Sequence, residues 1–296
     1  MRDVHSGILL IDKPAGITSA KAVAVVKRLT GSNKTGHAGT LDPLATGLLI
    51  CCLNQATKLA RFLLEGEKTY AAVLRLGIRT DSQDAAGRIL SRQDTSNITE
   101  TGVEKTMRGF TGSIQQQPPA YSALKYHGKP LYHWARKGKP VAKPPRTVVI
   151  SSLEIQKIAL PKVYFSVTCS AGTYIRTVCA DVGDSLGCGG HLMSLRRTAS
   201  CGFVVAQALD LEQLETMANT GAWKARLIPP VDALPGIPAH QADNALRDKI
   251  KFGRPIGPSD GIKIRSEKMK VIDADRNLLA IIDRKYRYCC VFPDGI

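Results

Sequence analysis

The sequence has 296 residues, of which 44% are hydrophobic and 22% are charged. This composition is typical of a folded globular protein and excludes a disordered, collagen-like or coiled-coil chain. The length suggests two domains, or one large domain with an appendage. The 41 lysines and arginines against 25 acidic residues give a formal net charge of +16. This excess predicts a polyanionic partner, with nucleic acid as the first candidate.

Two classes of protein are excluded by what the sequence lacks. No apolar stretch approaches the length of a membrane span, and the first residues do not follow the pattern of a secretory leader, so we expect a cytoplasmic protein with no membrane partner. The eight cysteines do not form a disulfide framework. Cys188 and His191 could supply half of a zinc site, but no second pair with ligand spacing exists, so no metal is expected.

The first predicted elements alternate between strand and helix. The apolar run 7–12 precedes a helix that Thr18 or Ser19 can cap and that Gly31 ends. A polar, glycine-rich stretch then leads to residues 48–53, which predict a buried strand by their length and composition.

The remaining predicted elements of the first 230 residues continue this mixture. They are a helix at 55–64, a strand at 68–77, a helix at 100–110, strands at 147–157 and 162–170, a helix at 173–186 and a strand at about 192–205. The mixture predicts the α+β class.

A change of composition after the Pro-rich stretch 229–238 indicates a domain boundary. Residues 231–296 contain 12 basic and 9 acidic residues, so most of the positive charge lies in the first 230. Short β-like runs follow at 261–264, 270–272 and 278–282. We therefore predict a first domain at 1–230 and a small β-rich domain at 231–296.

A long basic stretch lies between residues 105 and 153. It contains nine lysines and arginines and no acidic residue, and three tyrosines and Trp134 are interleaved with them. Such a run can be an ordinary solvated face. The combination of positive charge and aromatic rings favours RNA, because backbone contacts and base stacking need these two residue types.

The loop 36–47 is the most unusual segment of the chain. It holds three glycines, Pro43 and a single carboxylate, Asp42. On residue types alone, Asp-Pro is a common turn initiator. The alternative is a rigid loop that holds one carboxylate against an RNA sugar or base. A phosphate-binding loop fits poorly, because no Gly-Lys-Ser/Thr closes the Gly31–Gly36 spacing.

Seven motifs of this sequence, in order and spacing, resemble the TruB family of tRNA pseudouridine synthases. They are DKPAGITS at 12–19, GHAGTLDPLATGL at 36–48, KTY at 68–70, TDSQDAAG at 80–87, YSALK at 121–125, GTYIR at 172–176 and LRR at 195–197. The resemblance implies the mixed, mainly antiparallel sheet of pseudouridine synthases, and an isomerase that converts the T-loop uridine 55 of tRNA to pseudouridine by base flipping.

The resemblance implies three catalytic residues. Asp42 matches the catalytic carboxylate, Tyr70 the tyrosine that stacks on the displaced base, and Arg176 the arginine that pairs with the aspartate. The carboxylate could attack the anomeric carbon or assist proton loss at the neighbouring sugar carbon, and both routes stay open. The reaction has no redox step, so no cofactor is expected.

The resemblance also implies an RNA-binding surface. It includes a thumb-like insertion within about 105–147 that closes on the T-arm, and a PUA-like domain at 231–296. The residues assigned to RNA binding are His37, Lys125, Tyr174, Leu195, Arg196 and Arg197. The implied partner is the T-arm stem-loop of tRNA, with no obligatory protein partner and a monomeric enzyme.

Two rival functions remain at this point. An RNA-binding or tRNA-folding factor without turnover would need only the basic stretch and the tail. A relative that depends on a guide RNA and partner proteins would lack the thumb-like insertion, which this sequence contains.

Overall fold

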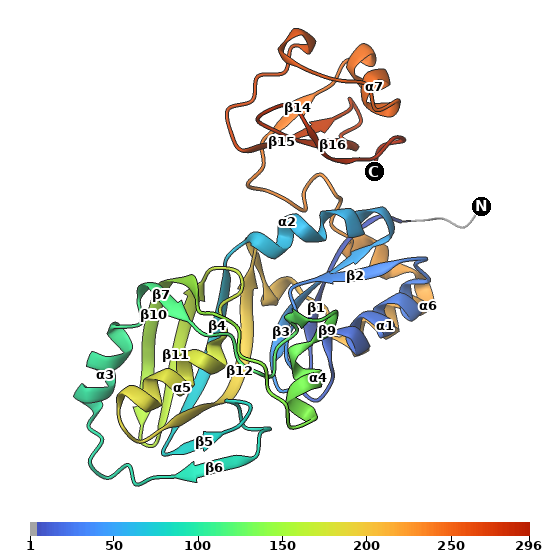
Figure 1. Cartoon of the computed structure of the whole chain (residues 1–296). Coiled ribbons are helices and arrows are strands. Elements are labelled where there is room, and N and C mark those ends of the chain that lie inside the picture. The colour runs from blue at the N-terminus through green and yellow to red at the C-terminus, as the bar shows by residue number, and fades with distance from the viewer. Residues whose placement is uncertain (1–4) are drawn as a thin grey trace.

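The computed structural model describes residues 5–296, and its main part is one large sheet with helices packed against it (Figure 1). The end of the chain forms a smaller part that lies beside α2 (Ala60–Glu65). The α+β class predicted from the sequence is confirmed. Within residues 5–296, no helix is both long enough and apolar enough to span a bilayer.

Nine strands form the main sheet. They are β1 (Gly7–Lys13), β2 (Thr35–Ala38), β3 (Thr46–Leu53), β4 (Lys68–Leu76), β7 (Gly112–Gln116), β10 (Arg146–Ala159), β11 (Lys162–Cys169), β12 (Gly190–Ser200) and β13 (Phe203–Val204). The order is β1-β3-β12-β4-β11-β10-β7, with β2 on β3 and β13 on β12. All pairs are antiparallel except β3 with β12, so the sheet is mainly antiparallel as predicted.

The first helix, α1 (Ser19–Thr30), begins and ends where the sequence predicts. The Thr18 side chain accepts a hydrogen bond from the Lys21 backbone N–H at 3.1 Å, which satisfies one of the free amides of the first turn. Gly31 ends the helix with a φ of 64°, a left-handed conformation that glycine adopts without steric cost.

The other helices cover the sheet or connect its strands. They are the 3-10 turns η1 (Asn54–Leu59), η2 (Val205–Gln207), η3 (Ala222–Arg226) and η4 (Pro258–Asp260), and the α-helices α3 (Glu100–Arg108), α4 (Leu131–Arg136), α5 (Ile175–Ser185), α6 (Leu211–Thr220) and α7 (Asn244–Lys251). The single helix predicted at 55–64 is instead η1 followed by α2.

Two hydrophobic clusters explain why some strands alternate and others do not. Helices α1, α3 and α5 cover one face of the sheet. β4 buries every second residue against this cluster, which is the pattern of a half-covered strand. β1 and β3 are buried on both faces, because α2 and part of the C-terminal unit cover the other side. The continuous apolar run 48–53 reflects this double burial.

The C-terminal unit has its own four-stranded sheet and its own core. The strands, in the order β14-β15-β16-β17, are β14 (Ala239–Gln241), β15 (Lys268–Ile272), β16 (Leu278–Asp283) and β17 (Tyr288–Val291). The β-rich character is as predicted, but the strand predicted at 261–264 is wrong. That run is irregular, because its first residue, Gly261, ends η4 in a left-handed conformation.

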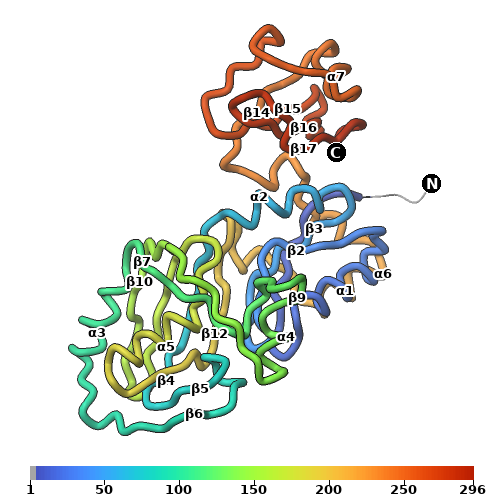
Figure 2. Tube along the Cα trace, viewed as in Figure 1, coloured from blue at the N-terminus to red at the C-terminus, as the bar shows by residue number. Residues whose placement is uncertain are grey.

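Two hairpins project from the main sheet. One pairs β5 (Ile78–Thr80) with β6 (Ile89–Arg92), and the other pairs β8 (Lys125–Tyr126) with β9 (Lys129–Pro130). The second hairpin and α4 belong to a long excursion, which leaves the sheet at β7 and returns at β10 (Figure 2). This excursion carries most of the basic stretch identified in the sequence.

Candidate active site

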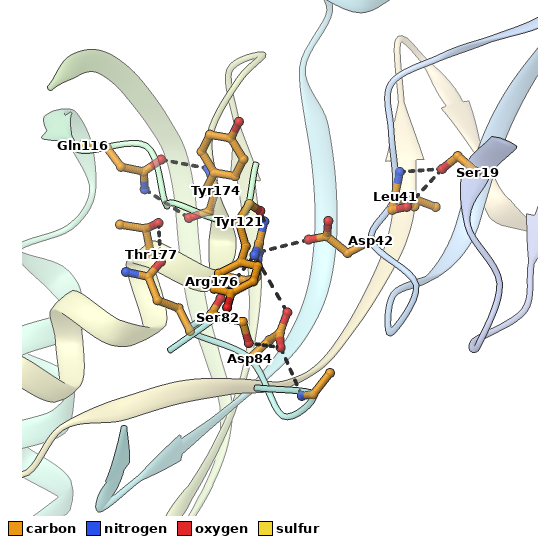
Figure 3. Close-up of polar contacts among 12 residues, drawn as sticks. Ser19, Leu41, Asp42, Ser82, Asp84, Gln116, Tyr121, Tyr174, Arg176 and Thr177 are labelled. Atoms are coloured by element: carbon orange, nitrogen blue, oxygen red, sulfur yellow. Dashed lines mark hydrogen bonds and ion pairs between the residues drawn. The ribbon is translucent and has the colours of Figure 1, made fainter. Parts of the chain in front are cut away.

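Asp42 lies on the loop between β2 and β3, and two hydrogen bonds fix this loop to the start of α1. The Ser19 hydroxyl donates to the Leu41 carbonyl at 3.0 Å and accepts from the Leu41 N–H at 2.8 Å (Figure 3). Gly47 closes the loop with a φ of 98°, and a Cβ there would lie 2.3 Å from the Arg197 carbonyl oxygen. The loop therefore needs glycine at this position, and it holds the carboxylate rigidly.

Arg176 is the partner of Asp42. Its Nε lies 3.0 Å from a carboxylate oxygen of Asp42, and the arginine side chain is 5% exposed. The guanidinium also donates to the carbonyls of Ser82 at 3.2 Å and Tyr121 at 2.9 Å (Figure 3). Arg176 thus joins the loop that carries Asp42, the β5–β6 turn and the start of the basic excursion. A charge-assisted bond of this kind fixes the direction of a carboxylate.

Asp84 is a buried carboxylate that sequence reasoning did not select. It lies 3.9 Å from the other side of the Arg176 guanidinium, and it accepts hydrogen bonds from the Ser82 hydroxyl at 2.6 Å and the Ala86 N–H at 3.0 Å. The turn that carries it is fixed to β12 by the bond from Ala85 N–H to the Leu192 carbonyl, at 2.9 Å. Two carboxylates therefore lie beside one guanidinium. Asp42 contacts its Nε, and Asp84 lies next to another nitrogen and helps to orient the arginine.

The surroundings of Asp42 act on its pKa in both directions. Burial raises the pKa above the ordinary 3.8, and the charge of Asp84 acts in the same direction, whereas Arg176 and Lys13 lower it. The net result is a raised pKa. The cation that most favours the ionised form of this carboxyl is therefore Arg176.

The rate of any reaction that needs ionised Asp42 should fall as the pH is lowered through this raised pKa. We expect the acid limb of the single-turnover rate to lie above pH 3.8, the ordinary pKa of an aspartate. In Arg176→Met the limb should move to higher pH, because the main group that lowers the pKa is gone. A limb that stays in place in this variant would show that Arg176 does not act on the ionisation of Asp42.

Tyr70 lies on β4, facing the same pocket as Asp42. It is 8% exposed and is paired across the sheet with Arg197 of β12. Burial raises the pKa of its hydroxyl, while the Arg197 charge and a hydrogen bond from Arg197 lower it. The aromatic ring offers a flat apolar surface, and the hydroxyl keeps a cationic neighbour.

These groups meet in a pocket of about 250 Å³. Six of the predicted site residues line it: Asp42, Tyr70, Tyr174, Arg176, Leu195 and Arg197. Lys68, Ser122 and Thr173 also line it, although the sequence did not single them out. The pocket has an apolar wall beside an ion pair, which suits a flat nucleobase attached to a sugar.

Three other predicted RNA-binding residues lie outside the pocket lining. Lys125 is exposed on β8, His37 is half-buried on β2, and Arg196 forms a two-fold ion pair with Asp12 at 3.0 and 2.6 Å. Burial lowers the pKa of His37, so it favours the neutral ring.

Arg197, the remaining predicted RNA-binding arginine, is buried. It is 1% exposed, and its guanidinium donates to the carbonyls of Leu48 at 2.6 Å and Gly39 at 3.0 Å. The two adjacent arginines of the sequence face different environments, because neighbouring residues of a strand point to opposite faces. Arg197 therefore lies in the pocket wall, and the RNA contact predicted for it stays a prediction.

The comparisons with known proteins agree with this architecture. Residues 27–175 match the N-terminal domain model of the TruB family pseudouridylate synthases, and residues 176–234 match the C-terminal domain model of tRNA pseudouridylate synthase B. The tRNA pseudouridine synthase B of Syntrophus aciditrophicus is 47% identical over 83% of this chain and 79% of its own length. That of Burkholderia mallei is 44% identical over 95% and 93%.

A solved structure supports the same assignment at the level of the fold. A chain in the crystal structure of a Cbf5-Nop10-Gar1 complex superposes with a TM-score of 0.73 at 26% identity, over 94% of this chain and 78% of that one. Fold and site thus define a pseudouridine synthase, an isomerase that acts on uridine in RNA. The chain belongs to the TruB family, whose members isomerise a uridine of tRNA to pseudouridine.

Proposed function

We propose that this protein isomerises the T-loop uridine 55 of tRNA, with Asp42 as the carboxylate that acts on the ribose. The observation that carries the proposal is the ion pair between Asp42 and the buried Arg176 at the edge of a pocket walled by Tyr70 and Leu195. A carboxylate in this place can reach a sugar only if the base has left the stack.

The proposed reaction uses two side chains of this pocket, Asp42 and Tyr70. The C1′–N1 bond breaks, the uracil turns, and C5 bonds to the same C1′, after which the C5 proton is lost. Asp42 either bonds to C1′ or takes a proton from C2′, and the geometry is compatible with both. The Tyr70 hydroxyl is the candidate to remove the C5 proton, and its ring stacks on the turned base. No cofactor enters this scheme.

The basic excursion and the C-terminal unit are proposed to bind the tRNA. The excursion, the thumb-like insertion within about 105–147, begins beside the pocket, since Ser122 and Ala123 line it. Lys125 lies exposed on its hairpin, and Tyr126 packs edge-to-face on Trp134 with 6.0 Å between the ring centroids.

We place the catalytic domain at 1–230 and a PUA-like RNA-binding domain at 231–296. His37 and Tyr174 are proposed to contact flipped nucleotides.

An RNA-binding factor without turnover fits this site less well. Asp42 carries a negative charge into a pocket that would meet a polyanion, and a pure binder gains nothing from it.

A guide-dependent enzyme is the other alternative. We propose a monomer that acts in the cytoplasm on naked tRNA, because the basic excursion supplies an RNA-binding surface of its own.

The position of the modified uridine is tested with a series of T-arm hairpins, each carrying tritium at C5 of one uridine. The purified protein alone should release tritium from the hairpin labelled at position 55 and from no other. Release only after addition of another RNA or protein would favour the guide-dependent alternative. Tight binding without release from any hairpin would favour the pure binder.

Affinity for the T-arm should depend strongly on salt, because the net charge of +16 implies many phosphate contacts. A plot of the logarithm of the association constant against that of the salt concentration should be linear and steep. Lys125→Ala should reduce this slope by about one without changing the pH profile of catalysis. An unchanged slope in the variant would remove Lys125 from the RNA interface.

A further inference from the structure

Two buried cations in the pocket wall have no carboxylate partner. Lys68 is 6% exposed and Arg197 is 1% exposed. The Lys68 ammonium donates to the carbonyls of Leu64, at 2.7 Å, and Gly66, and the Arg197 guanidinium donates to two other carbonyls. Among residues 5–296, neither forms an ion pair with an acidic side chain. Burying two charges in this way is costly, and in the pocket wall it leaves positive charge that no described side chain neutralises.

The charges that line the pocket do not cancel. Asp42 and Arg176 neutralise each other, and Asp84 adds one negative charge behind the arginine. Lys68 and Arg197 leave the lining with a net positive charge even when Asp84 is included. A neutral uracil has no charge that matches this surplus.

Both cations come from strands of the main sheet, next to Tyr70. Lys68 and Tyr70 are two residues apart on β4, so their side chains share one face of the strand. Arg197 is directly opposite Tyr70 on β12, and its charge lowers the pKa of the Tyr70 hydroxyl. Asp42, which is proposed to face the sugar, comes from a different loop.

We propose that Lys68 and Arg197 stabilise the uracil as its anion after the C1′–N1 bond breaks. This inference rests on the proposed function. When the bond breaks, its electron pair goes to N1 and spreads over the two carbonyl oxygens of the uracil, while C1′ bonds to Asp42 or C2′ loses a proton to it. When C5 bonds to C1′, the C1′–Asp42 bond breaks and Asp42 leaves as the carboxylate, or, on the other route, Asp42 returns its proton to C2′. The base then loses the C5 proton and N1 gains one, so charge and protons balance. Fixed cations that meet a developing charge in a water-poor site stabilise the transition state.

The experiment compares two target nucleosides in Lys68→Met. A fluorine at C5 withdraws electrons and stabilises the uracil anion, so a 5-fluorouridine target depends less on the protein's charge. We expect the variant to consume uridine in a T-arm hairpin about 100-fold more slowly than the wild type, and 5-fluorouridine only about tenfold more slowly. The measurement is the single-turnover loss of the N1-linked nucleoside at saturating enzyme.

Lys270 provides a matched control. It is also 6% exposed, and it also donates to two backbone carbonyls, those of Val231 and Leu234, but it lies in the C-terminal unit. Because the C-terminal unit is proposed to bind tRNA, Lys270→Met is judged by the ratio of its single-turnover rates on uridine and 5-fluorouridine at saturating enzyme, which should equal that of the wild type. Lys68→Gln keeps a hydrogen-bond donor without the charge, so it tests the same idea if Lys68→Met does not fold, and it should show the same difference between targets.

Three outcomes have distinct meanings. An equal loss on uridine and 5-fluorouridine would overturn the proposal, because the lysine would then not act on the charge of the uracil. A weaker affinity for the hairpin with a normal rate at saturation would also overturn it and would assign Lys68 to a phosphate. Failure of the wild-type protein on both targets would contradict the proposed function itself.

Discussion

Asp42→Asn should abolish tritium release from a C5-labelled T-arm hairpin, lowering the rate by roughly four orders of magnitude or more. The amide can neither bond to C1′ as a carboxylate nor take a proton from C2′, and it no longer pairs with Arg176 as an ion. Affinity for the hairpin should stay within about tenfold of the wild type, since one charge contributes only a kcal/mol or two to association. The two measurements together separate catalysis from binding.

Asp94→Asn is the matched control for this substitution. Asp94 is an exposed carboxylate in the loop before α3, where it accepts hydrogen bonds from Ser96. Its loss should leave tritium release unchanged. Normal release by Asp42→Asn would refute the assignment of the catalytic carboxylate, and loss of both release and binding would mean that the loop itself has collapsed.

Tyr70→Phe should lower the single-turnover rate by about 100-fold or more while RNA binding is retained. Phenylalanine keeps the ring that is proposed to stack on the base and removes only the hydroxyl, whose pKa the Arg197 charge lowers. The fold should tolerate the change, because Arg197 keeps its two bonds to backbone carbonyls. The rate is measured at saturating enzyme, so that a change in affinity does not enter it.

The control for this prediction is a second tyrosine on the same sheet. Tyr164→Phe on β11 removes a half-buried hydroxyl outside the lining of the pocket with Asp42, and it should leave the rate unchanged. If Tyr70→Phe is as fast as the wild type, the hydroxyl has no chemical role and only stacking remains.

Local signals in the sequence predicted the elements that depend on local physics. The Thr18 cap and Gly31 at the end of α1 satisfy backbone groups of that helix alone, so their effect is visible without the fold. The alternation of β4 reflects a single covered face, and the run 48–53 reflects two. Each of these patterns has one structural cause.

Features that depend on distant parts of the chain are not visible in local sequence patterns. Asp84 acts only because Arg176, far along the sequence, lies beside it in the fold. The burial of Arg197 depends on the carbonyls of Gly39 and Leu48. The sequence predicts a loop where β2 lies, because these four residues contain a glycine and a histidine. They form a strand only through their pairing with β3.

The candidate site residues depend on another kind of signal, which is the resemblance of whole motifs to those of a family. Asp42, Tyr70 and Arg176 were identified through motifs that resemble those of a family, and residue types alone would have favoured a turn, a packing tyrosine and a surface charge. The structure brings these three residues to one pocket. Their roles in the reaction stay proposals that the substitutions above test.

The most direct test of the account is a crystal structure of Asp42→Asn bound to an unmodified T-arm hairpin, since this variant should bind RNA without turning it over. In this complex uridine 55 should have left the stack, with its uracil between Tyr70 and Leu195 and its C1′ within about 3.5 Å of the side chain at position 42. A complex in which that uridine stays stacked, or in which its ribose lies away from position 42, would contradict this prediction.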